Sequence, residues 1–328
     1  MIKNLEVYMS EKIKNSKRVV IVPHNNIDFD AIGSASGIAL IAKKFKKEYR
    51  IIVNDQPAFM DPGVKMIINE IRKKENTIID KKKYITMQDP DDLFILTDVN
   101  KKNLISVADL IRKKENTVII DHHNEDANTL DADFKYIKKE VSSASEIITN
   151  LLIASRIQIP SNVANYLFAG IHLDTNGLTK NTTSNTHRMI SKLMASGASN
   201  NTISTYFVED FDKDRLVQDL VKASEMQRYA IRIILADDDE EVELISLAKA
   251  ADYLLKYDLD ASFAVGRVDN NTIYISARSK GKINVGEVMK EFGGGGHIHS
   301  GAARIQDSTV PEVGVKLKKL LKYPYSID

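Results

Sequence analysis

The feature that most constrains the fold is a set of short apolar runs, each followed by acidic or imidazole side chains. Arg18–Val22, Leu93–Thr97 and Thr117–Ile120 are rich in Val, Ile and Leu. Runs of this kind are typical of strands buried on both faces of a parallel sheet. The carboxyl end of such a strand is the first place where a charged group can reach solvent and a ligand. Charged residues at several strand ends therefore predict one shared functional site.

Helical segments alternate with the apolar runs. Ala31–Lys44 and Asp61–Lys73 have helical spacing and lie between predicted strands. This alternation predicts an α/β fold with a doubly wound, mostly parallel sheet. Met1–Arg18 is interpreted as a short amphipathic helix, and Ser143–Glu146 fits a capping box that would start a later helix. The remaining predicted elements are strands at Arg50–Val53, Leu93–Asp98 and Thr117–Asp121 and helices at Asn162–Leu173 and Ser184–Ser196.

The carboxyl half has a different pattern, which predicts a smaller α+β domain. Ser262–Val268 and Thr272–Ala277 are predicted to form a hairpin. The residues between them, Asp269-Asn270-Asn271, are of types that tolerate positive φ. Asn284–Glu291 and Val310–Leu321 are predicted helices on one side of a small sheet.

Length and composition favour two domains. With 328 residues and 43% hydrophobic content, the chain can bury two separate cores. Thr202–Tyr229 is polar with helical spacing, and the acidic run Asp237–Glu243 is interpreted as a solvated loop. We expect a first domain at 1–197, a helical linker at 198–229 and a second domain at 230–328, with a cleft between the domains.

Charge and composition argue against several classes of protein. The 46 Lys and Arg residues nearly balance the 45 Asp and Glu residues, which argues against holding long duplex nucleic acid by neutralising many phosphates. Cysteine is absent, so nitrogen and oxygen must hold any metal, and a cytoplasmic location is favoured. No apolar stretch approaches the roughly 20 residues that span a bilayer, and the amino terminus lacks the apolar core of a signal peptide. We therefore expect no membrane segment.

The first candidate cluster lies in His24-Asn25-Asn26-Ile27-Asp28-Phe29-Asp30, on the turn between a strand and a helix. Asp28 and Asp30 are two positions apart, so both can project toward one region while the residue between them points away. Carboxylate and neutral imidazole suit manganese, cobalt, iron or zinc better than an all-oxygen magnesium cage. Manganese is the first metal that we expect. In the alternative interpretation, Asp30 only caps the helix that begins at Ala31, and His24 is a surface histidine.

Three further candidates follow other predicted elements. Asp98 ends an apolar run and is by itself explained as well by an N-cap or an ion pair. Asp121-His122-His123 places three consecutive ionisable groups at a strand end, which is costly unless they are paired or bind a metal. Asp174 precedes Thr175-Asn176-Gly177 and lies at a helix end or in a loop, where a capping role is the alternative.

In chain order, these residues resemble the four motifs of the DHH phosphoesterase family. That order is His24, Asp28 and Asp30, then Asp98, then Asp121-His122-His123, then Asp174. Gly293-Gly294-Gly295-Gly296-His297 is similar to the glycine-rich signature of the DHH-associated C-terminal domain. Several segments also look like the catalytic module of the GdpP-type cyclic di-AMP phosphodiesterases. These segments are Asp28–Gly33, Ser142–Glu146, Ala250–Asp252, Ala261–Val265 and Ile275–Ser279.

The resemblance implies two divalent cations, with manganese expected, and a catalytic set of Asp98, Asp121, His122 and His123. Asp98 would bridge both cations, Asp121 would orient the neighbouring imidazole, and His123 would touch the scissile phosphate. The family usually has proline where this chain has Ile27, but no ligand is lost by this difference. One cation would be held by His24, Asp28 and Asp98, and the other by Asp30, Asp98, His122 and Asp174.

The predicted substrate contacts lie in the carboxyl half. A glycine run lets backbone N–H groups approach phosphate oxygens without a Cβ in the way, and an arginine or histidine can add donors. Glycine runs are also common in flexible turns, and an arginine on a strand is commonly solvated, so both alternatives stay open. The candidates are Arg278, Gly294, Gly295, Gly296 and His297.

The resemblance implies hydrolysis of cyclic di-AMP to pApA by water that two metal ions activate, with a small dinucleotide as the partner. One alternative is NrnA-like hydrolysis of short oligoribonucleotides, pApA or 3′-phosphoadenosine 5′-phosphate. A nucleotide-binding module without catalysis is the contrasting class, but all six expected ligand positions are retained. A homodimer stays open. The initiating Met1 favours a stand-alone enzyme over an excised module.

Overall fold

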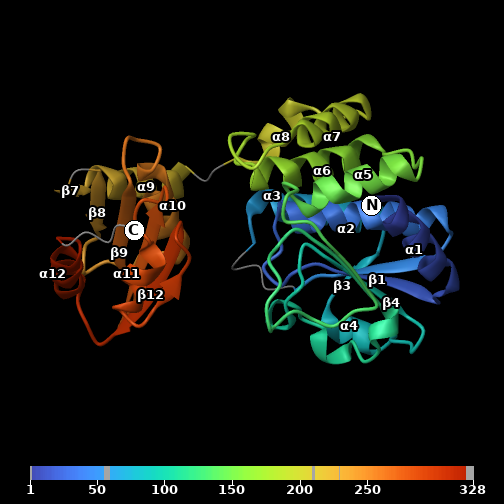
Figure 1. The fold of residues 1–328 in the computed structure, drawn as a ribbon, viewed down its shortest axis with the longest axis horizontal. Coiled ribbons are helices and arrows are strands. Elements are labelled where there is room, and N and C mark those ends of the chain that lie inside the picture. Colours follow the sequence, from blue (N-terminus) through green and yellow to red (C-terminus); the bar gives the residue numbers. More distant parts are fainter. Residues whose placement is uncertain (1, 55–59, 209–210, 229, 323–328) are drawn as a thin grey trace. The chain divides into compact units, whose positions relative to one another are not determined.

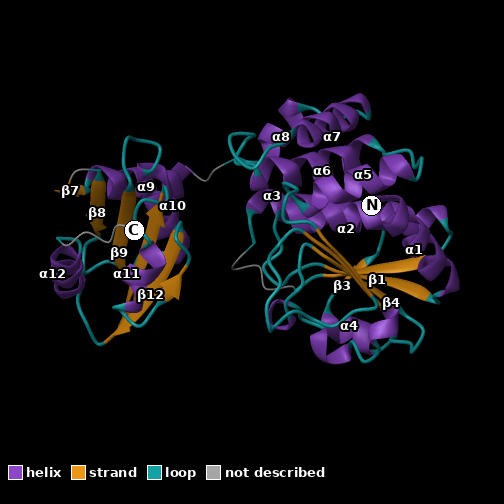
Figure 2. Cartoon of the chain, in the orientation of Figure 1, coloured by secondary structure: helices purple, strands orange, loops and turns teal. Residues whose placement is uncertain are grey.

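The computed structural model describes residues 2–54, 60–208, 211–228 and 230–322. The chain divides into two compact units, Met1–Val208 and Glu209–Asp328. Figure 1 follows the chain from blue to red, and Figure 2 distinguishes the helices and strands of each unit. Each unit has its own sheet and its own hydrophobic core, so each is described by itself.

The first unit is built on a six-stranded sheet in which all neighbouring strands are parallel. From β1 the chain order runs outward through β2 and β3 to one edge, and from β4 through β5 and β6 to the other. The switch point therefore lies between β1 and β4, and ligands of such sheets bind outside the carboxyl ends of the strands there. In sheet order the strands are β3 (Ile78–Ile79), β2 (Glu48–Ile52), β1 (Arg18–Val22), β4 (Leu93–Thr97), β5 (Thr117–Asp121) and β6 (Phe134–Ile137).

The strands of this sheet alternate their side chains between two cores. Val19 and Ile21 of β1 belong to one core, and Val20 and Val22 belong to the other. Because both faces are buried, the central strands are continuously apolar. The first core also takes residues from α1 (Ile2–Asn15), α2 (Phe29–Lys44), α3 (Pro62–Lys74), α5 (Ala144–Ala154), α6 (Ser161–Asp174), α7 (Ser184–Ala195) and α8 (Asn200–Tyr206). The second core lies under α4 (Lys81–Ile85) and irregular segments, on the other side of the sheet (Figure 2).

The predicted doubly wound parallel sheet is confirmed. The strands at Arg18–Val22 and Thr117–Asp121 have the predicted bounds, and the amphipathic helix before the first strand is α1. Sequence reasoning missed β3 and β6, which have only two and four residues. Runs this short carry no recognisable periodicity.

The segment 198–229, which we expected to be a helical linker, contains three separate elements. α8 packs into the first core through Ile203 and Tyr206. α9 (Phe211–Lys222) and β7 (Glu225–Arg228) belong to the second unit. The helical spacing thus marks two short helices, and the strand after them was not predicted. Tyr229, the expected end of the helix, lies outside the described residues.

The second unit has a mixed six-stranded sheet. β8 and β9 are parallel, and the other neighbouring strands are antiparallel. One face packs on α11 (Val285–Lys290) and α12 (Val310–Leu320), and the other packs on α9 and α10 (Leu244–Leu254). In sheet order the strands are β11 (Gly295–Gly296), β12 (Ser300–Gln306), β10 (Thr272–Ser279), β9 (Ala261–Asp269), β8 (Ile231–Leu235) and β7.

The predicted hairpin is formed by β9 and β10, and the two predicted helices, α11 and α12, share one core on one face of the sheet. The smaller α+β domain is therefore confirmed as a fold class. The sequence did not predict α10, β8 or β12. Within the described part of the chain, no helix combines the length and apolar character needed to cross a bilayer.

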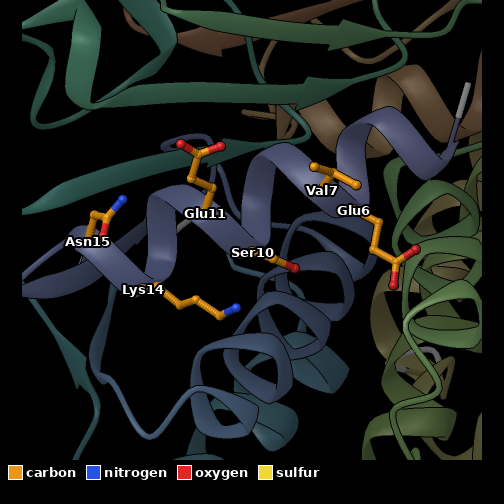
Figure 3. A pocket seen from close by; sticks show the side chains of 6 residues that line it. All are labelled: Glu6, Val7, Ser10, Glu11, Lys14 and Asn15. Atoms are coloured by element: carbon orange, nitrogen blue, oxygen red, sulfur yellow. The ribbon is translucent and has the colours of Figure 1, made fainter.

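A broad hollow of about 520 Å³ runs along α1. Figure 3 shows that its lining comes from successive turns of this helix alone. Val7 is the one apolar side chain in the lining, and it is 65% exposed. A hollow lined by one face of one helix has no groups converging from other elements. We therefore regard it as ordinary surface and not as a site. The lining residues are Glu6, Val7, Ser10, Glu11, Lys14 and Asn15.

Candidate metal centre

Ionisable residues from separate segments meet at the carboxyl ends of the central strands. His24 follows β1, Asp98 follows β4, and His122 follows Asp121, the last residue of β5. Asp174 is the last residue of α6. The cluster therefore lies at the carboxyl ends of the strands, as the sequence predicted, and beside the switch point of the sheet, which the sequence did not predict.

Asp28 and Asp30 lie at the start of α2 and have different partners. Asp28 is the N-cap, and its carboxylate accepts a hydrogen bond from the Ala31 backbone N–H at 2.9 Å. Asp30 is fully buried, and its two oxygens accept hydrogen bonds from the backbone N–H groups of Ala144 and Ser145, each at 2.7 Å. The alternative in which Asp30 caps this helix is therefore wrong.

The first group of candidate ligands consists of His24, Asp28 and Asp98. Nε2 of His24 lies 3.5 Å from Oδ2 of Asp28 and 3.4 Å from Oδ2 of Asp98. Asp98 has a left-handed backbone, with φ of 58°, and is only 3% exposed. A non-glycine residue in this region is uncommon, although aspartate adopts it more readily than most residues.

The second group is centred on His122. Its Nε2 lies 3.2 Å from Oδ2 of Asp174, 3.9 Å from Oδ2 of Asp30 and 3.4 Å from Oδ1 of Asp98. Asp98 thus turns one carboxylate oxygen toward His24 and the other toward His122. This arrangement lets a single carboxylate serve both groups.

Both groups fit a cation. One ligand atom from each of His24, Asp28 and Asp98 lies within 4.8 Å of the others, and the same holds for Asp30, His122 and Asp174. Among the described residues, Oδ1 of Asp98 and Nε2 of His122 are buried and have no hydrogen-bond partner. Buried polar atoms are normally paired. Two unpaired atoms that face one another are therefore suited to bind a shared cation. Carboxylate oxygen and imidazole nitrogen together suit manganese, iron, cobalt or zinc.

The electrostatics of the two histidines agree with this interpretation. Burial acts to lower the pKa of His24, but Asp28 and Asp98 outweigh burial and raise this pKa to about 10. Burial also opposes the effect of Asp174 and Asp98 on His122, whose pKa rises to about 11. The negative field that holds these protons would equally attract a divalent cation, which competes with protons for imidazole nitrogen.

The buried carboxyl groups repel one another. Burial, with the charge of Asp174, raises the pKa of Asp30 to about 7. Burial, with the charge of Asp30, raises the pKa of Asp98 to about 6. Burial also raises the pKa of Asp174. A cation between these groups would remove this cost by neutralising the repulsion.

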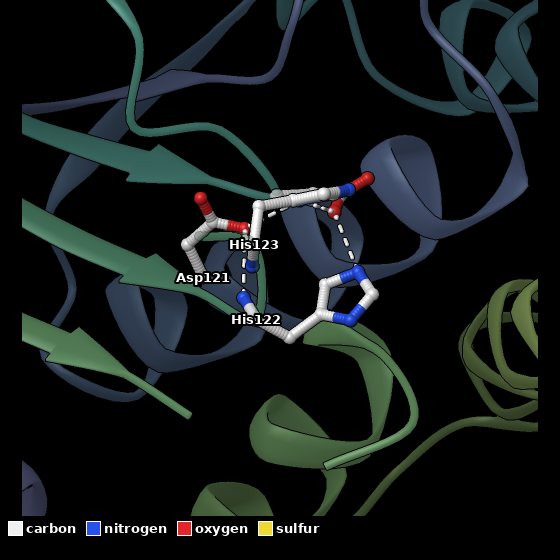
Figure 4. A group of neighbouring side chains, drawn as sticks. Asp121, His122 and His123 are labelled. Atoms are coloured by element: carbon white, nitrogen blue, oxygen red, sulfur yellow. Dashed lines mark hydrogen bonds and ion pairs between the residues drawn. The ribbon is translucent and has the colours of Figure 1, made fainter. Parts of the chain in front are cut away.

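Asp121 organises the loop that carries the two histidines (Figure 4). Its Oδ1 accepts hydrogen bonds from the backbone N–H groups of His122 and His123 and lies 2.9 Å from Nδ1 of His123. Its Oδ2 accepts a hydrogen bond from Nδ2 of Asn100 at 2.6 Å. The hydrogen bond to Asp121 raises the pKa of His123, whose side chain is 56% exposed. His123 is thus held at Nδ1 while most of its ring is open to solvent.

A cavity of about 340 Å³ is lined by six of the candidate residues, His24, Asp28, Asp98, Asp121, His123 and Asp174. Its lining includes Asn25, Asn100 and Lys101, which sequence reasoning did not select. Asn100 is 1% exposed, and Oδ1 of Asn25 is buried without a hydrogen-bond partner among the described residues. An isolated asparagine carries no pattern, and the only available signal was proximity to Asp98 and His24 in the sequence.

The glycine run of the second unit is shaped by close packing against β12. A Cβ on Gly294 would lie 2.1 Å from the carbonyl oxygen of Ala302, and Gly296 has a φ of 148°. The N–H of Gly294 donates to Met289, and the N–H of His297 donates to Ser300. These two N–H groups already donate within the fold, so they are not free to bind a phosphate. This supports a role in the backbone fold, rather than in substrate binding, for part of the run. Gly295 has open space around its Cβ position.

Arg278 lies on β10, on the opposite side of β12 from the glycine run. Its Nε donates to Oδ1 of Asp252 at 2.9 Å, and its Nη1 donates to Ser276 and to the carbonyl of Ala277. The alternative in which Arg278 is only solvated therefore does not describe these hydrogen bonds. Substrate contact by Arg278, Gly294, Gly295, Gly296 and His297 stays a prediction.

The parallel sheet and its cluster at the switch point define an α/β protein with a candidate two-cation centre. Residues 18–171 match the DHH family, N-terminal domain, and residues 227–323 match the DHHA1 domain. The chain therefore carries a DHH domain followed by a DHHA1 domain.

Individual relatives match most of the chain. This chain is 32% identical over 321 residues to the cyclic-di-AMP phosphodiesterase GdpP of Bacillus subtilis (strain 168). The match covers 94% of this chain and 48% of GdpP. The chain thus spans about half the length of that relative. It is 28% identical over 313 residues to the bifunctional oligoribonuclease and PAP phosphatase NrnA of Mycoplasma genitalium (strain ATCC 33530), covering 89% of this chain and 90% of NrnA. The crystal structure of an exopolyphosphatase-related protein from Bacteroides fragilis has the same fold, with a TM-score of 0.77, 21% identity and 98% of both chains covered.

Proposed function

We propose that this chain is a metal-dependent phosphodiesterase that hydrolyses cyclic di-AMP to the linear dinucleotide pApA. The observation that carries the proposal is the position of Asp98, whose two oxygens face two separate histidines at 3.4 Å each. A carboxylate in this position is suited to join two cations. The identity to GdpP across both domains supports cyclic di-AMP as the substrate.

We assign two divalent cations, expected to be manganese, to the two groups of ligands. When bound, a pair of such ions lowers the pKa of water and offsets the charge that develops on a phosphate. The chain contributes the fixed positions of the ligands and a buried acidic surrounding that selects for positive charge. The first ion would be held by His24, Asp28 and Asp98, and the second by Asp30, Asp98, His122 and Asp174.

His123 is assigned to the phosphate. Asp121 holds its Nδ1 and raises its pKa, which favours the doubly protonated ring, whose Nε2–H can donate to a phosphate oxygen. Hydrolysis adds one water and breaks one P–O3′ bond of the ring, so the single product is linear and keeps both adenosines. The second domain is proposed to contact the substrate through Arg278, Gly295 and His297.

Product analysis tests this proposal. The manganese-loaded chain is offered cyclic di-AMP, pApA and 3′-phosphoadenosine 5′-phosphate in parallel, and products are separated by chromatography. We expect cyclic di-AMP to be consumed first with pApA accumulating. Consumption of only pApA or the bisphosphate would overturn the assignment of cyclic di-AMP.

An NrnA-like activity is the second candidate. It is favoured by the match to NrnA, which extends over 89% of this chain and 90% of that relative. In that case the chain would degrade short oligoribonucleotides and 3′-phosphoadenosine 5′-phosphate. The same parallel assay separates the two candidates, because only the first requires cleavage of a ring without a free end.

A further inference from the structure

Asp30 is held by the first turn of α5, which is far away in the sequence. The two N–H groups that bind its oxygens belong to Ala144 and Ser145, more than 100 positions later in the chain. Two short hydrogen bonds to the start of a helix stabilise a carboxylate and fix its orientation. The lone pairs that remain on Asp30 are those available to a cation. The position of α5 therefore decides where these lone pairs point.

Tight packing allows α5 little freedom at this point. A Cβ on Gly170 of α6 would lie 2.4 Å from Oγ of Ser145, and a Cβ on Gly33 of α2 would lie 2.9 Å from the same atom. Ser145 is thus wedged between two helices that can approach only because both have glycine there. Packing of this kind transmits a small shift of α5 directly to Asp30.

Glu146 is the residue that fixes this turn from the other side. It is 1% exposed, yet its partners in the structure are neutral donors. Oε2 accepts hydrogen bonds from Oγ of Ser142 at 2.6 Å and from Oγ1 of Thr186 at 2.8 Å, and Oε1 accepts one from Nδ2 of Asn185 at 2.6 Å. A buried carboxylate without a cation is costly and is retained only when its hydrogen bonds are well formed.

The donors of Glu146 connect α5 with the start of α7. Thr186 belongs to the capping box of α7, since its Oγ1 also accepts the backbone N–H of Thr183. The segment that leads from Asp174 into α7 ends at this box. Glu146 therefore joins the turn that holds Asp30 to the segment that follows Asp174, and both aspartates face His122.

We propose that Glu146 is a positioning residue for the second group of ligands, Asp30, His122 and Asp174, while the first group of His24, Asp28 and Asp98 is independent of it. This inference rests on the proposed function, because it takes the second group to hold a cation. In the described part of the chain, the hydrogen bonds and ion pairs of the His24 and Asp28 side chains are with one another, Asp98 and Ala31, none of which lies in α5 or α7. Loss of Glu146 should therefore affect one cation site and not the other.

Two variants of the full chain test the inference by Mn²⁺ titration, followed by electron paramagnetic resonance and calorimetry. Glu146→Gln keeps the shape and removes the charge, and Thr186→Val removes one donor from the α7 side. The matched control is Thr117→Val, because Thr117 is as buried as Thr186 and donates one hydrogen bond, to the carbonyl oxygen of Lys113. Thr117 begins β5, whereas the histidines follow the other end of this strand. All three lose a buried polar interaction, but only the first two touch the link to Asp30.

We expect both variants to bind Mn²⁺ in two classes, with one class weakened roughly tenfold to a hundredfold, the usual effect of residues that orient metal ligands. Turnover should recover at high Mn²⁺, and Thr117→Val should bind as the wild type does. Unchanged binding by both variants, or equal weakening of both classes, would overturn the inference alone. If Glu146→Gln does not fold, Thr186→Val decides. Absence of Mn²⁺ binding by the wild type would overturn the proposed function as well.

Discussion

Asp98 combines a left-handed backbone with a buried carboxylate that faces both histidines. Asp98→Asn should keep the backbone, because asparagine tolerates positive φ, while it removes the charge shared by the two groups. We expect Mn²⁺ stoichiometry to fall to one ion or none and turnover to fall at least about a hundredfold, more than is usual for residues that only orient ligands. Metal analysis of the purified variant and a rate assay measure both effects.

The control for this variant is Asp131→Asn, since Asp131 is a surface residue whose side chain is 72% exposed. It removes the same charge far outside both ligand groups. Two bound Mn²⁺ ions and near-normal turnover in Asp98→Asn would contradict the bridging role of Asp98.

Asn100 gives a second prediction for a single residue. Asn100→Ala removes the donor that holds Oδ2 of Asp121, so Asp121 should hold His123 less firmly. We expect kcat to fall roughly tenfold and Mn²⁺ affinity to fall less, because Asn100 touches the ligand His122 only indirectly, through the Asp121 carboxylate that binds the His122 backbone N–H. Asn165→Ala is the matched control, since Asn165 is also buried and hydrogen-bonded but lies on α6. A loss of Mn²⁺ affinity equal to the loss of kcat would argue against this role.

Sequence alone located the candidate ligands because each lies beside the end of an apolar run or helix, where the chemistry is visible. The roles of Asn100 and Glu146 could not be predicted in the same way. Ser143 was correctly predicted as a helix start, and it caps α5 through the backbone N–H of Glu146. The side chain of Glu146, however, binds residues of α7 rather than completing the capping box. Such contacts depend on tertiary packing, which no local pattern records.

Helix α2 lies close to α6 because of glycine. A Cβ on Gly33 would lie 2.5 Å from the carbonyl oxygen of Tyr166, a backbone atom that cannot move aside cheaply. Gly33→Ala should therefore force the helices apart and lower the free energy of unfolding by about 1–3 kcal/mol. Gly295→Ala serves as the control, since no heavy atom lies within 4 Å of its Cβ position. Urea denaturation compares the two variants, and equal stability would show that α2 can shift without cost.

The amino end of β1 carries a buried ion pair. Arg18 is 6% exposed, and its Nη1 lies 3.4 Å from Oδ2 of Asp92, which is 1% exposed. Arg18→Leu leaves Asp92 without its cation, so we expect a loss of about 3 kcal/mol in the free energy of unfolding at neutral pH. Mn²⁺ binding should not change, because the ligands lie at the opposite end of the strand.

The loss caused by Arg18→Leu should depend on pH. Burial raises the pKa of Asp92 in the folded state, so the fold favours the protonated form of this group. The penalty should be full above the folded pKa and should shrink as pH falls through it, because protonation removes the unpaired charge. Urea denaturation at neutral and mildly acidic pH measures this trend. Adding Asp92→Asn should recover part of the stability, and a double variant as unstable as Arg18→Leu would refute the ion-pair explanation.

Elements were predictable where the pattern was long or continuous. β1, β4 and β5 are buried on both faces, so their sequences are uninterrupted apolar runs. β11 has two residues and consists of glycine, and β12 contains Gly301 and small alanines, so neither presents a strand pattern. These strands form because their neighbours β10 and α11 provide partners, which is a property of the assembled sheet rather than of the segment.

At the scale of the whole molecule, the two units have separate hydrophobic cores. The proposed ligands and His123 belong to Met1–Val208, and the other predicted substrate contacts, Arg278 and the glycine run with His297, belong to Glu209–Asp328. The change in sequence pattern predicted two domains. The sequence could not locate the division itself, because α8 and α9 have similar polar helical spacing although they belong to different units.

This division predicts that binding of metal and recognition of substrate can be separated. The fragment 1–208 has its own core, so we expect it to fold, to bind Mn²⁺ and to cleave a small phosphodiester that lacks nucleobases, such as bis(p-nitrophenyl) phosphate. It should not turn over cyclic di-AMP, because it lacks the contacts to the dinucleotide that are predicted for Arg278, the glycine run and His297. Circular dichroism, Mn²⁺ titration and parallel rate assays check these expectations. Arg278→Ala in the full chain provides the comparison. We expect this variant to have an increased KM for cyclic di-AMP and an unchanged rate with the small diester. Full cyclic di-AMP turnover by the fragment would show that the first unit recognises the dinucleotide unaided.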